Sequence, residues 1–159
     1  MDINNPIFDF ETDFAGTLRC IPMCVRLKLD HCGIKLSLSQ WNRMPHAERL
    51  QMVSESCDAP ANASSYKSFL MQLIKKWTSS NVEEVPLDRA PAWADPSNRP
   101  QRLVEYAIAL GVAPPSADQW SSLTPLQRFA LFKLTRPGHD NDNFIPAMRE
   151  FGLLTLASR

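Results

Sequence analysis

Cysteine is the residue type in this sequence best suited to chemistry, because a thiolate can attack a substrate or bind a soft metal ion. The four cysteines are Cys20, Cys24, Cys32 and Cys57. All of them lie in the first 57 residues, so disulfides between them would leave most of the chain without a cross-link. We therefore predict reduced thiols that are buried as small apolar side chains.

A metal or iron–sulfur site is the alternative interpretation of the cysteines. If the segment from Pro22 onward is helical, Cys20 and Cys32 lie about 18 Å apart along its axis, at about 1.5 Å per residue. That distance is too long for both thiols to bind one ion within this segment alone. Cys20 precedes a helix start, where a thiolate is favoured. A thiol-based carrier in which the fold gathers Cys20, Cys32 and Cys57 stays open as the alternative hypothesis.

Histidines and acidic residues show no other metal-ligand spacing. The three histidines, His31, His46 and His139, are far apart in sequence and none has a paired partner on a helix. The polar run 138–143 is rich in oxygen ligands, but a calcium loop counted from Asp140 would need glutamate where Phe151 stands. We predict a capped turn at this run, and no metal and no cofactor for the chain.

The motifs of common enzyme classes are missing from the sequence. It contains no nucleophile elbow, Walker loop or dinucleotide fingerprint, and its 5 glycines leave little material for a phosphate-binding loop. Lys plus Arg and Asp plus Glu are equal at 17 each, so no net field favours a nucleic acid. The sequence shows no apolar run of about 18 residues and no signal peptide. We therefore expect a cytoplasmic protein that is not an enzyme.

Helical segments must position these side chains, and prolines and glycines mark where they begin and end. Pro22 opens the first segment, and Gly33 stands where a left-handed C-cap is needed. The predicted helices cover about residues 22–32, 45–56, 64–77, 100–110, 125–132 and 143–151. About six helices predict an all-α fold, and the length fits a single domain over residues 1–159.

The remaining segments are predicted to be extended or irregular. Phenylalanines alternate with acidic residues in residues 1–18, which predicts a short extended N-terminal arm. Trp41 and Trp120 are placed in loops between helices. Residues 80–99 hold three prolines and form an irregular connector, in which Trp93 is expected to be an anchor.

The two halves of the chain share a pattern. Residues of the same type or character recur at an offset of 78 or 79, as in Pro22/Pro100, Gly33/Gly111, Gln40/Gln119, Trp41/Trp120, Arg49/Arg128, Tyr66/Phe144, Leu70/Met148 and Leu73/Phe151. The same order of caps, tryptophans and helix phases predicts two related three-helix units, at about residues 19–79 and 98–154. Chance is the alternative, because caps and apolar steps recur in any helical protein.

Two stretches of the sequence carry a family resemblance. The first comprises Phe10-Glu11-Thr12-Asp13-Phe14, Leu18-Arg19-Cys20-Ile21-Pro22-Met23 and Cys32-Gly33-Ile34-Lys35-Leu36; the second comprises Gln127-Arg128-Phe129-Ala130-Leu131, Arg136-Pro137-Gly138-His139-Asp140-Asn141 and Asn143-Phe144. With these motifs the chain resembles the nitrate reductase-associated protein family of bacteria. The resemblance implies an accessory protein needed for active assimilatory nitrate reductase, and it implies no known active site.

The first hypothesis is therefore a maturation factor or chaperone that binds a molybdenum-containing nitrate reductase and assists its assembly, cofactor insertion or stabilisation. Arginines and aromatic residues are enriched where binding energy concentrates. The predicted partner-binding residues are Phe10, Arg19, Arg26, Arg136, His139, Asp140 and Asn141. The thiol-based metal or iron–sulfur carrier is the second hypothesis. A third is a small enzyme that acts on a molybdopterin precursor, which would need a pocket with converging polar groups.

Overall fold

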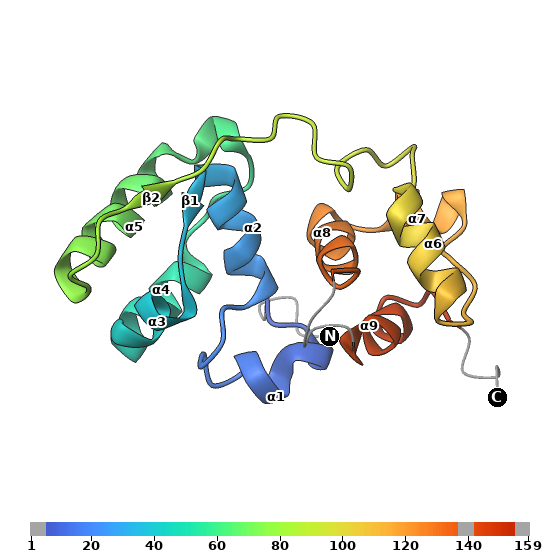
Figure 1. The fold of residues 1–159 in the computed structure, drawn as a ribbon, viewed down its shortest axis with the longest axis horizontal. Helices are drawn as coiled ribbons and strands as arrows, with labels where there is room; N and C mark the ends of the chain where they lie inside the picture. The colour runs from blue at the N-terminus through green and yellow to red at the C-terminus, as the bar shows by residue number, and fades with distance from the viewer. Residues whose placement is uncertain (1–5, 137–141, 155–159) are drawn as a thin grey trace. The chain divides into compact units, whose positions relative to one another are not determined.

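The computed structural model describes residues 6–136 and 142–154, and it is mostly helical, as the sequence predicts (Figure 1). The chain divides into two compact units, Met1–Asp88 and Arg89–Arg159, called here the N-terminal and the C-terminal unit. Their boundary falls inside the predicted connector 80–99. The assignment of residues 1–159 to a single domain stays a prediction.

The N-terminal unit is built around helix α2. Its elements in chain order are the 3-10 helix η1 (Asp9–Glu11), α1 (Thr12–Ala15), α2 (Met23–Cys32), β1 (Ile34–Lys35), α3 (Leu38–Arg43), α4 (His46–Ser54), η2 (Pro60–Asn62), α5 (Ser64–Trp77) and β2 (Glu83–Glu84). Helix α2 packs against α4 and α5, and α3 packs against α5. Because α2 contacts both α4 and α5, most of its side chains are buried, and these include Cys24 and Cys32.

The end of α2 is fixed by a glycine and a short sheet. Gly33 has φ +68°, which closes the helix in the left-handed conformation that glycine adopts without steric cost. Its carbonyl accepts a hydrogen bond of 2.8 Å from the amide of Val85. Strands β1 and β2 then pair antiparallel, with Ile34 opposite Glu84. The connector is thereby attached to the helical part of the N-terminal unit.

Among its described residues, the C-terminal unit contains four helices, α6 (Gln101–Ala109), α7 (Ala117–Ser122), α8 (Pro125–Lys133) and α9 (Phe144–Glu150). Helices α8 and α9 pack against each other. Trp93 is buried and meets Phe129 of α8 edge to face, with ring centroids 5.4 Å apart. The predicted role of Trp93 as an anchor of the connector is therefore confirmed.

The two units share local features at the predicted pairs. Ser37 and Ser116 each accept a hydrogen bond from the amide of the glutamine three residues on, Gln40 and Gln119 respectively, and so begin α3 and α7 with a capping box. Trp41 and Trp120 are both fully buried. Each indole Nε1 donates to a main-chain carbonyl from an earlier segment of its own unit. The common origin of the two units stays a prediction.

The prediction of an extended N-terminal arm is wrong. The segment forms η1 and α1 instead, because Glu11 is completely buried and its carboxylate binds the main chain. Glu11 Oε1 accepts from the Phe8 amide and Oε2 accepts from the Met23 amide, both at 3.1 Å. Glu11 therefore caps η1 and also the first turn of α2.

The placement of Trp41 and Trp120 in loops is also wrong. Both lie inside short helices, α3 and α7, which the capping boxes initiate. With α1, these raise the number of α-helices in the described part of the chain to nine, against about six predicted. A serine followed three residues later by glutamine was the sequence signal for both helices. The connector 80–99 is likewise not wholly irregular, because it holds β2.

Candidate functional site

The predicted partner-binding residues of the N-terminal half lie on consecutive elements. Phe10, on η1, is half-buried and stacks on Phe8 with ring centroids 5.5 Å apart. Arg19 is exposed in the turn between α1 and α2. Arg26 of α2 is half-buried, and its Nε donates to the Ile21 carbonyl at 3.1 Å. Arg26 therefore stabilises the start of α2, and Arg19 is the more accessible of the two arginines.

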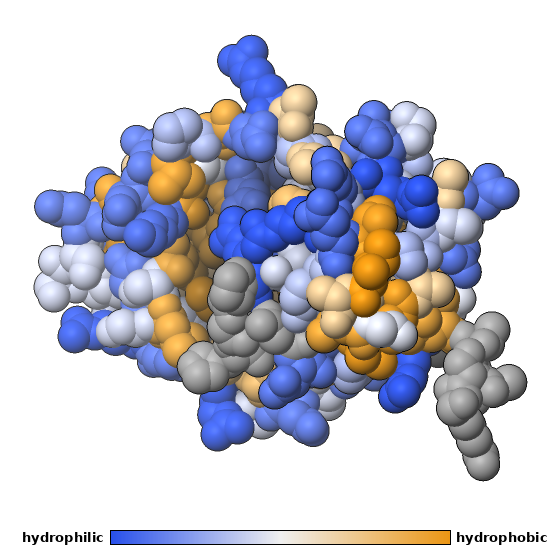
Figure 2. Space-filling model, turned by 45° about the vertical axis from the view of Figure 1, so that its right-hand side comes forward, coloured by the Kyte–Doolittle hydropathy of each residue, from blue (hydrophilic) through white to orange (hydrophobic). Residues whose placement is uncertain are grey.

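The predicted binding residues of the C-terminal half are described only in part. Arg136 is exposed and follows α8. His139, Asp140 and Asn141 lie outside the described residues. Apolar side chains also reach the surface of this unit, since Ile108 and Leu110 at the end of α6 are 62% and 41% exposed. Figure 2 shows such apolar (orange) side chains among hydrophilic (blue) ones.

The cysteines are mostly buried, as predicted. Cys24, Cys32 and Cys57 are buried in the N-terminal unit and unbonded to each other covalently, while Cys20 is half-buried. Burial raises the pKa of Cys24 to about 11 and that of Cys32 to about 12. Burial also raises the pKa of Cys57, against the opposing effects of the Cys32 thiol and the Lys28 ammonium group. These thiols are protonated at neutral pH, which makes them poor nucleophiles and poor metal ligands.

Only part of the hypothetical thiol site is assembled. Cys32 Sγ donates to the Ala63 carbonyl at 3.8 Å and Cys57 Sγ donates to the Lys28 carbonyl at 4.0 Å, and the two thiols influence each other's pKa. Within the ranges that the structure describes, no three His, Cys, Asp or Glu side chains are grouped to hold a metal ion. Cys20 is therefore not placed with Cys32 and Cys57 as a third ligand.

Lys28 lies on α2 between Cys24 and Cys32. Its Nζ donates to the carbonyls of Val53 at 2.6 Å, Glu55 at 2.7 Å and Met52 at 3.4 Å, which lie at the end of α4. The ammonium group also lies 5.6 Å from the ring centroid of Tyr66. Burial lowers the pKa of Lys28 from its ordinary value. The sequence holds no local signal for these contacts, because they join residues 24 to 27 positions apart.

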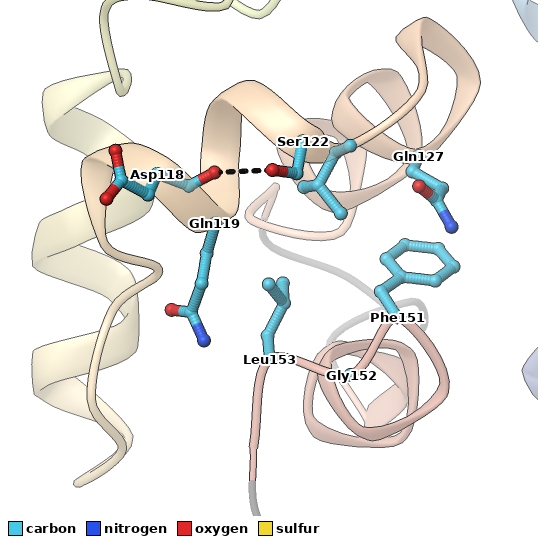
Figure 3. Close-up of a pocket in the computed structure, with 8 residues that line it drawn as sticks. Asp118, Gln119, Ser122, Gln127, Phe151, Gly152 and Leu153 are labelled. Atoms are coloured by element: carbon cyan, nitrogen blue, oxygen red, sulfur yellow. Dashed lines mark hydrogen bonds between the residues drawn. The ribbon is translucent and has the colours of Figure 1, made fainter.

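A surface pocket in the C-terminal unit was missed by the sequence analysis. This α7 pocket has a volume of about 330 Å³ (Figure 3). Its lining residues are Asp118, Gln119, Ser122, Leu123, Gln127, Phe151, Gly152 and Leu153. They come from α7, the first turn of α8 and the segment that follows α9. None of the predicted binding residues is among them.

The polar groups of the α7 pocket are held by helix caps. Gln119 Oε1 accepts from the Ser116 amide and Gln127 Oε1 accepts from the Thr124 amide, both at 2.9 Å. Each carboxamide therefore has a fixed orientation, and its Nε2 group has no hydrogen-bond partner in residues 6–136 and 142–154. The capping boxes were visible in the sequence, but the approach of the segment after α9 depends on the fold.

No helix in the described residues has the length and the apolar character to cross a membrane.

The fold and the sites thus define a small, mostly helical protein with protonated internal thiols and an open pocket at its surface whose glutamines are held by helix caps. The chain belongs to the family of conserved nitrate reductase-associated proteins, whose family model matches residues 7–151. The family resemblance predicted from the sequence is thereby confirmed. No curated protein and no solved structure matches the chain.

Proposed function

We propose that this chain is an accessory protein of nitrate reductase that acts by binding the enzyme, in its assembly, cofactor insertion or stabilisation. The observation that carries the proposal is membership of the nitrate reductase-associated family. The family model matches residues 7–151, which cover most of both compact units. We further propose that the enzyme is the molybdenum-containing, assimilatory type.

The chemistry of the described side chains supports binding over catalysis. A thiol nucleophile needs a pKa near the working pH, whereas Cys24 and Cys32 ionise only at about 11 and 12. Lys28 is occupied by three main-chain carbonyls. Lys28 is thus engaged in holding α2 to the end of α4.

Arg19 on the N-terminal unit and Arg136 on the C-terminal unit are the residues we assign to the contact with the enzyme, each considered on its own unit. Both are exposed, and guanidinium groups bind carboxylates in a fixed planar geometry. Phe10, half-buried beside Phe8, would add apolar contact area on the N-terminal unit. Arg26 contributes less, because its Nε already bonds to Ile21.

Co-purification and a binding isotherm with purified nitrate reductase test the proposal. The wild-type chain is expected to bind, and the double substitution Arg19→Ala, Arg136→Ala is expected to weaken binding at least about tenfold, or about 1.4 kcal/mol. Arg43→Ala is the control, since Arg43 is also exposed but lies at the end of α3. Absence of binding by the wild-type chain overturns the function; equal binding by all three proteins overturns only the contact surface.

A thiol-based carrier for the same enzyme is the second candidate. The electrostatic influence of Cys32 and Cys57 on each other favours it, whereas burial opposes it by raising the pKa of both thiols. Anaerobic purification followed by metal analysis and a visible absorption spectrum distinguishes the two candidates. A colourless, metal-free protein that still supports the reductase rejects the carrier.

A further inference from the structure

The α7 pocket lies beside the end of α9. In the N-terminal unit, α5 runs through Trp77 and packs against α3, with Ile74 completely buried. At the offset of 78, Ile74 corresponds to Gly152, which has φ +73° and follows the end of α9. Within residues 142–154, α9 ends at Glu150, before the positions that correspond at this offset to the last turn of α5.

The pocket combines an apolar surface with fixed hydrogen-bond donors. Leu153 is 8% exposed and Phe151 is half-buried. Figure 3 shows the carboxamides of Gln119 and Gln127 on two sides of the pocket, with the Leu153 and Phe151 side chains between them. The capping boxes occupy both Oε1 atoms, so each glutamine presents N–H donors to an incoming group.

These donors select a neutral acceptor. No Lys, Arg or His lines the pocket in the part of the chain that the structure describes, and Asp118 lines it with a carboxylate. A phosphate or another anion would meet that carboxylate without a compensating cation. Main-chain carbonyl oxygens are neutral and accept from amide N–H groups at full strength. A volume of about 330 Å³ is at the small end for ligand pockets and suits one or two side chains.

We propose that the α7 pocket binds a segment of a partner protein, which inserts one apolar side chain between Phe151 and Leu153 and offers main-chain carbonyls to Gln119 and Gln127. That the segment belongs to nitrate reductase rests on the proposed function, whereas its peptide chemistry does not.

Five substitutions distinguish the loss of the hydrogen-bond donors and of the pocket volume from a general loss of structure. Gln119→Glu and Gln127→Glu remove the Nε2 donors but keep an oxygen for each capping box, because glutamate serves there as well as glutamine. Gln40→Glu makes the same change in the capping box of α3 and is the control. Ser122→Trp fills the pocket, and Ser121→Trp is its control.

The two serines are closely matched. Both are exposed, and both hydroxyls donate to the Asp118 carbonyl, at 3.0 Å from Ser121 and 2.8 Å from Ser122. Only Ser122 is among the lining residues of the pocket. A difference between the two tryptophan variants therefore reports the pocket and not the loss of a helix-end hydrogen bond.

The direct test titrates the full chain with the blocked dipeptide N-acetyl-leucyl-leucinamide and follows the carboxamide signals in ¹⁵N NMR spectra. We expect the Gln119 and Gln127 signals to shift and the Gln40 signal to stay. The double Gln→Glu variant is expected to bind at least about tenfold more weakly, since it loses two hydrogen bonds that are each worth about 1 kcal/mol. Ser122→Trp is expected to weaken binding by at least about tenfold as well, because it fills the pocket. Unmoved pocket signals at about 0.1 M peptide, well above a millimolar dissociation constant, overturn the proposal.

Binding to purified nitrate reductase then separates this inference from the proposed function. If the reductase binds the wild-type chain and Ser121→Trp but not Ser122→Trp, both stand. If it binds Ser122→Trp and the double Gln→Glu variant as tightly as wild type, the pocket is not the partner site and the function stands. If the dipeptide shifts the pocket signals while the reductase does not bind, the peptide pocket stands and the function fails.

Discussion

Trp41 and Leu18 are joined by a short hydrogen bond that ties α3 to the turn before α2. The indole Nε1 of Trp41 donates to the Leu18 carbonyl at 2.7 Å, and Arg49 Nη1 donates to the same oxygen at 2.6 Å. Leu18 has φ +60°, a left-handed conformation that costs a non-glycine residue about 1 kcal/mol or more. The two donors therefore hold the turn in a backbone conformation that its own sequence does not favour.

Replacing Trp41 by phenylalanine tests this bond. We expect Trp41→Phe to lower the free energy of unfolding by about 2–4 kcal/mol, from the lost hydrogen bond and the cavity in a fully buried site. Trp77→Phe is the control, because the buried Nε1 of Trp77 has no acceptor among the described residues. That control should lose about 1 kcal/mol or less. Urea unfolding followed by circular dichroism measures both, and equal losses would contradict the role of the bond.

The sequence predicted the long helices well because their signals are local. Pro22, Gly33 and Thr124 mark the ends of helices by effects that act within a few residues, and α2 and α8 begin and end close to where these residues place them. Trp41 was misplaced because a fully buried indole in a short helix looks like a loop residue unless the serine and glutamine around it are recognised as a capping box.

Gly33 and Gly111 offer a second matched pair. Both have positive φ, +68° and +78°, but a Cβ at Gly33 would lie 2.8 Å from the Val85 carbonyl oxygen and 3.1 Å from Leu87 Cδ2. At Gly111 no described atom lies within 4 Å of the added Cβ. We expect Gly111→Ala to cost about 1 kcal/mol for the left-handed conformation alone, and Gly33→Ala to cost about 3 kcal/mol or more. Thermal or urea unfolding compares them; a loss at Gly111 as large as at Gly33 would mean that the close approach of Val85 and Leu87 is unimportant.

The candidate sites could be predicted only in part, for a physical reason. Burial of Cys24 and Cys32 followed from the apolar spacing of α2, which a sequence displays. The α7 pocket depends on where the chain after α9 returns, and the contacts of Lys28 with the end of α4 join residues more than 20 positions apart. Such long-range approaches are set by packing of the whole unit, so no local pattern announces them.

Lys28 is predicted to be a structural residue. Lys28→Met leaves the carbonyls of Val53 and Glu55 without their 2.6 Å and 2.7 Å donor, and hydrogen bonds to a charged group are worth about 1.5–3 kcal/mol. We expect a loss of about 2–4 kcal/mol in the free energy of unfolding. Lys35→Met should change the free energy of unfolding by less than about 1 kcal/mol. Lys35 is exposed, and the distance of 3.9 Å between its Nζ and Glu83 Oε1 across the sheet is long for an ion pair. Urea unfolding decides, and a neutral Lys28→Met variant would refute the assignment.

Alkaline pH should destabilise the N-terminal unit through its thiols. The folded chain holds the pKa of Cys24 at about 11 and that of Cys32 at about 12, above the ordinary value of 9.0 that applies once the chain unfolds. Between pH 9.0 and these values the folded state binds more protons than the unfolded state, so stability falls as pH rises. Below pH 9.0 the contribution of the thiols is constant. The lowered pKa of Lys28 acts in the opposite direction just below its ordinary value of 10.5.

The expected slope is up to about 1.4 kcal/mol per pH unit for each buried thiol. Urea unfolding under reducing conditions, repeated at several values between about pH 8 and about pH 10.5, measures it. Cys24→Ala removes one titrating thiol, so its free energy of unfolding should fall less steeply with pH than that of the wild type, whatever its absolute stability. Lys28→Met removes the opposing group and should fall more steeply. Parallel curves for all three proteins would show that these buried groups do not govern the alkaline limit.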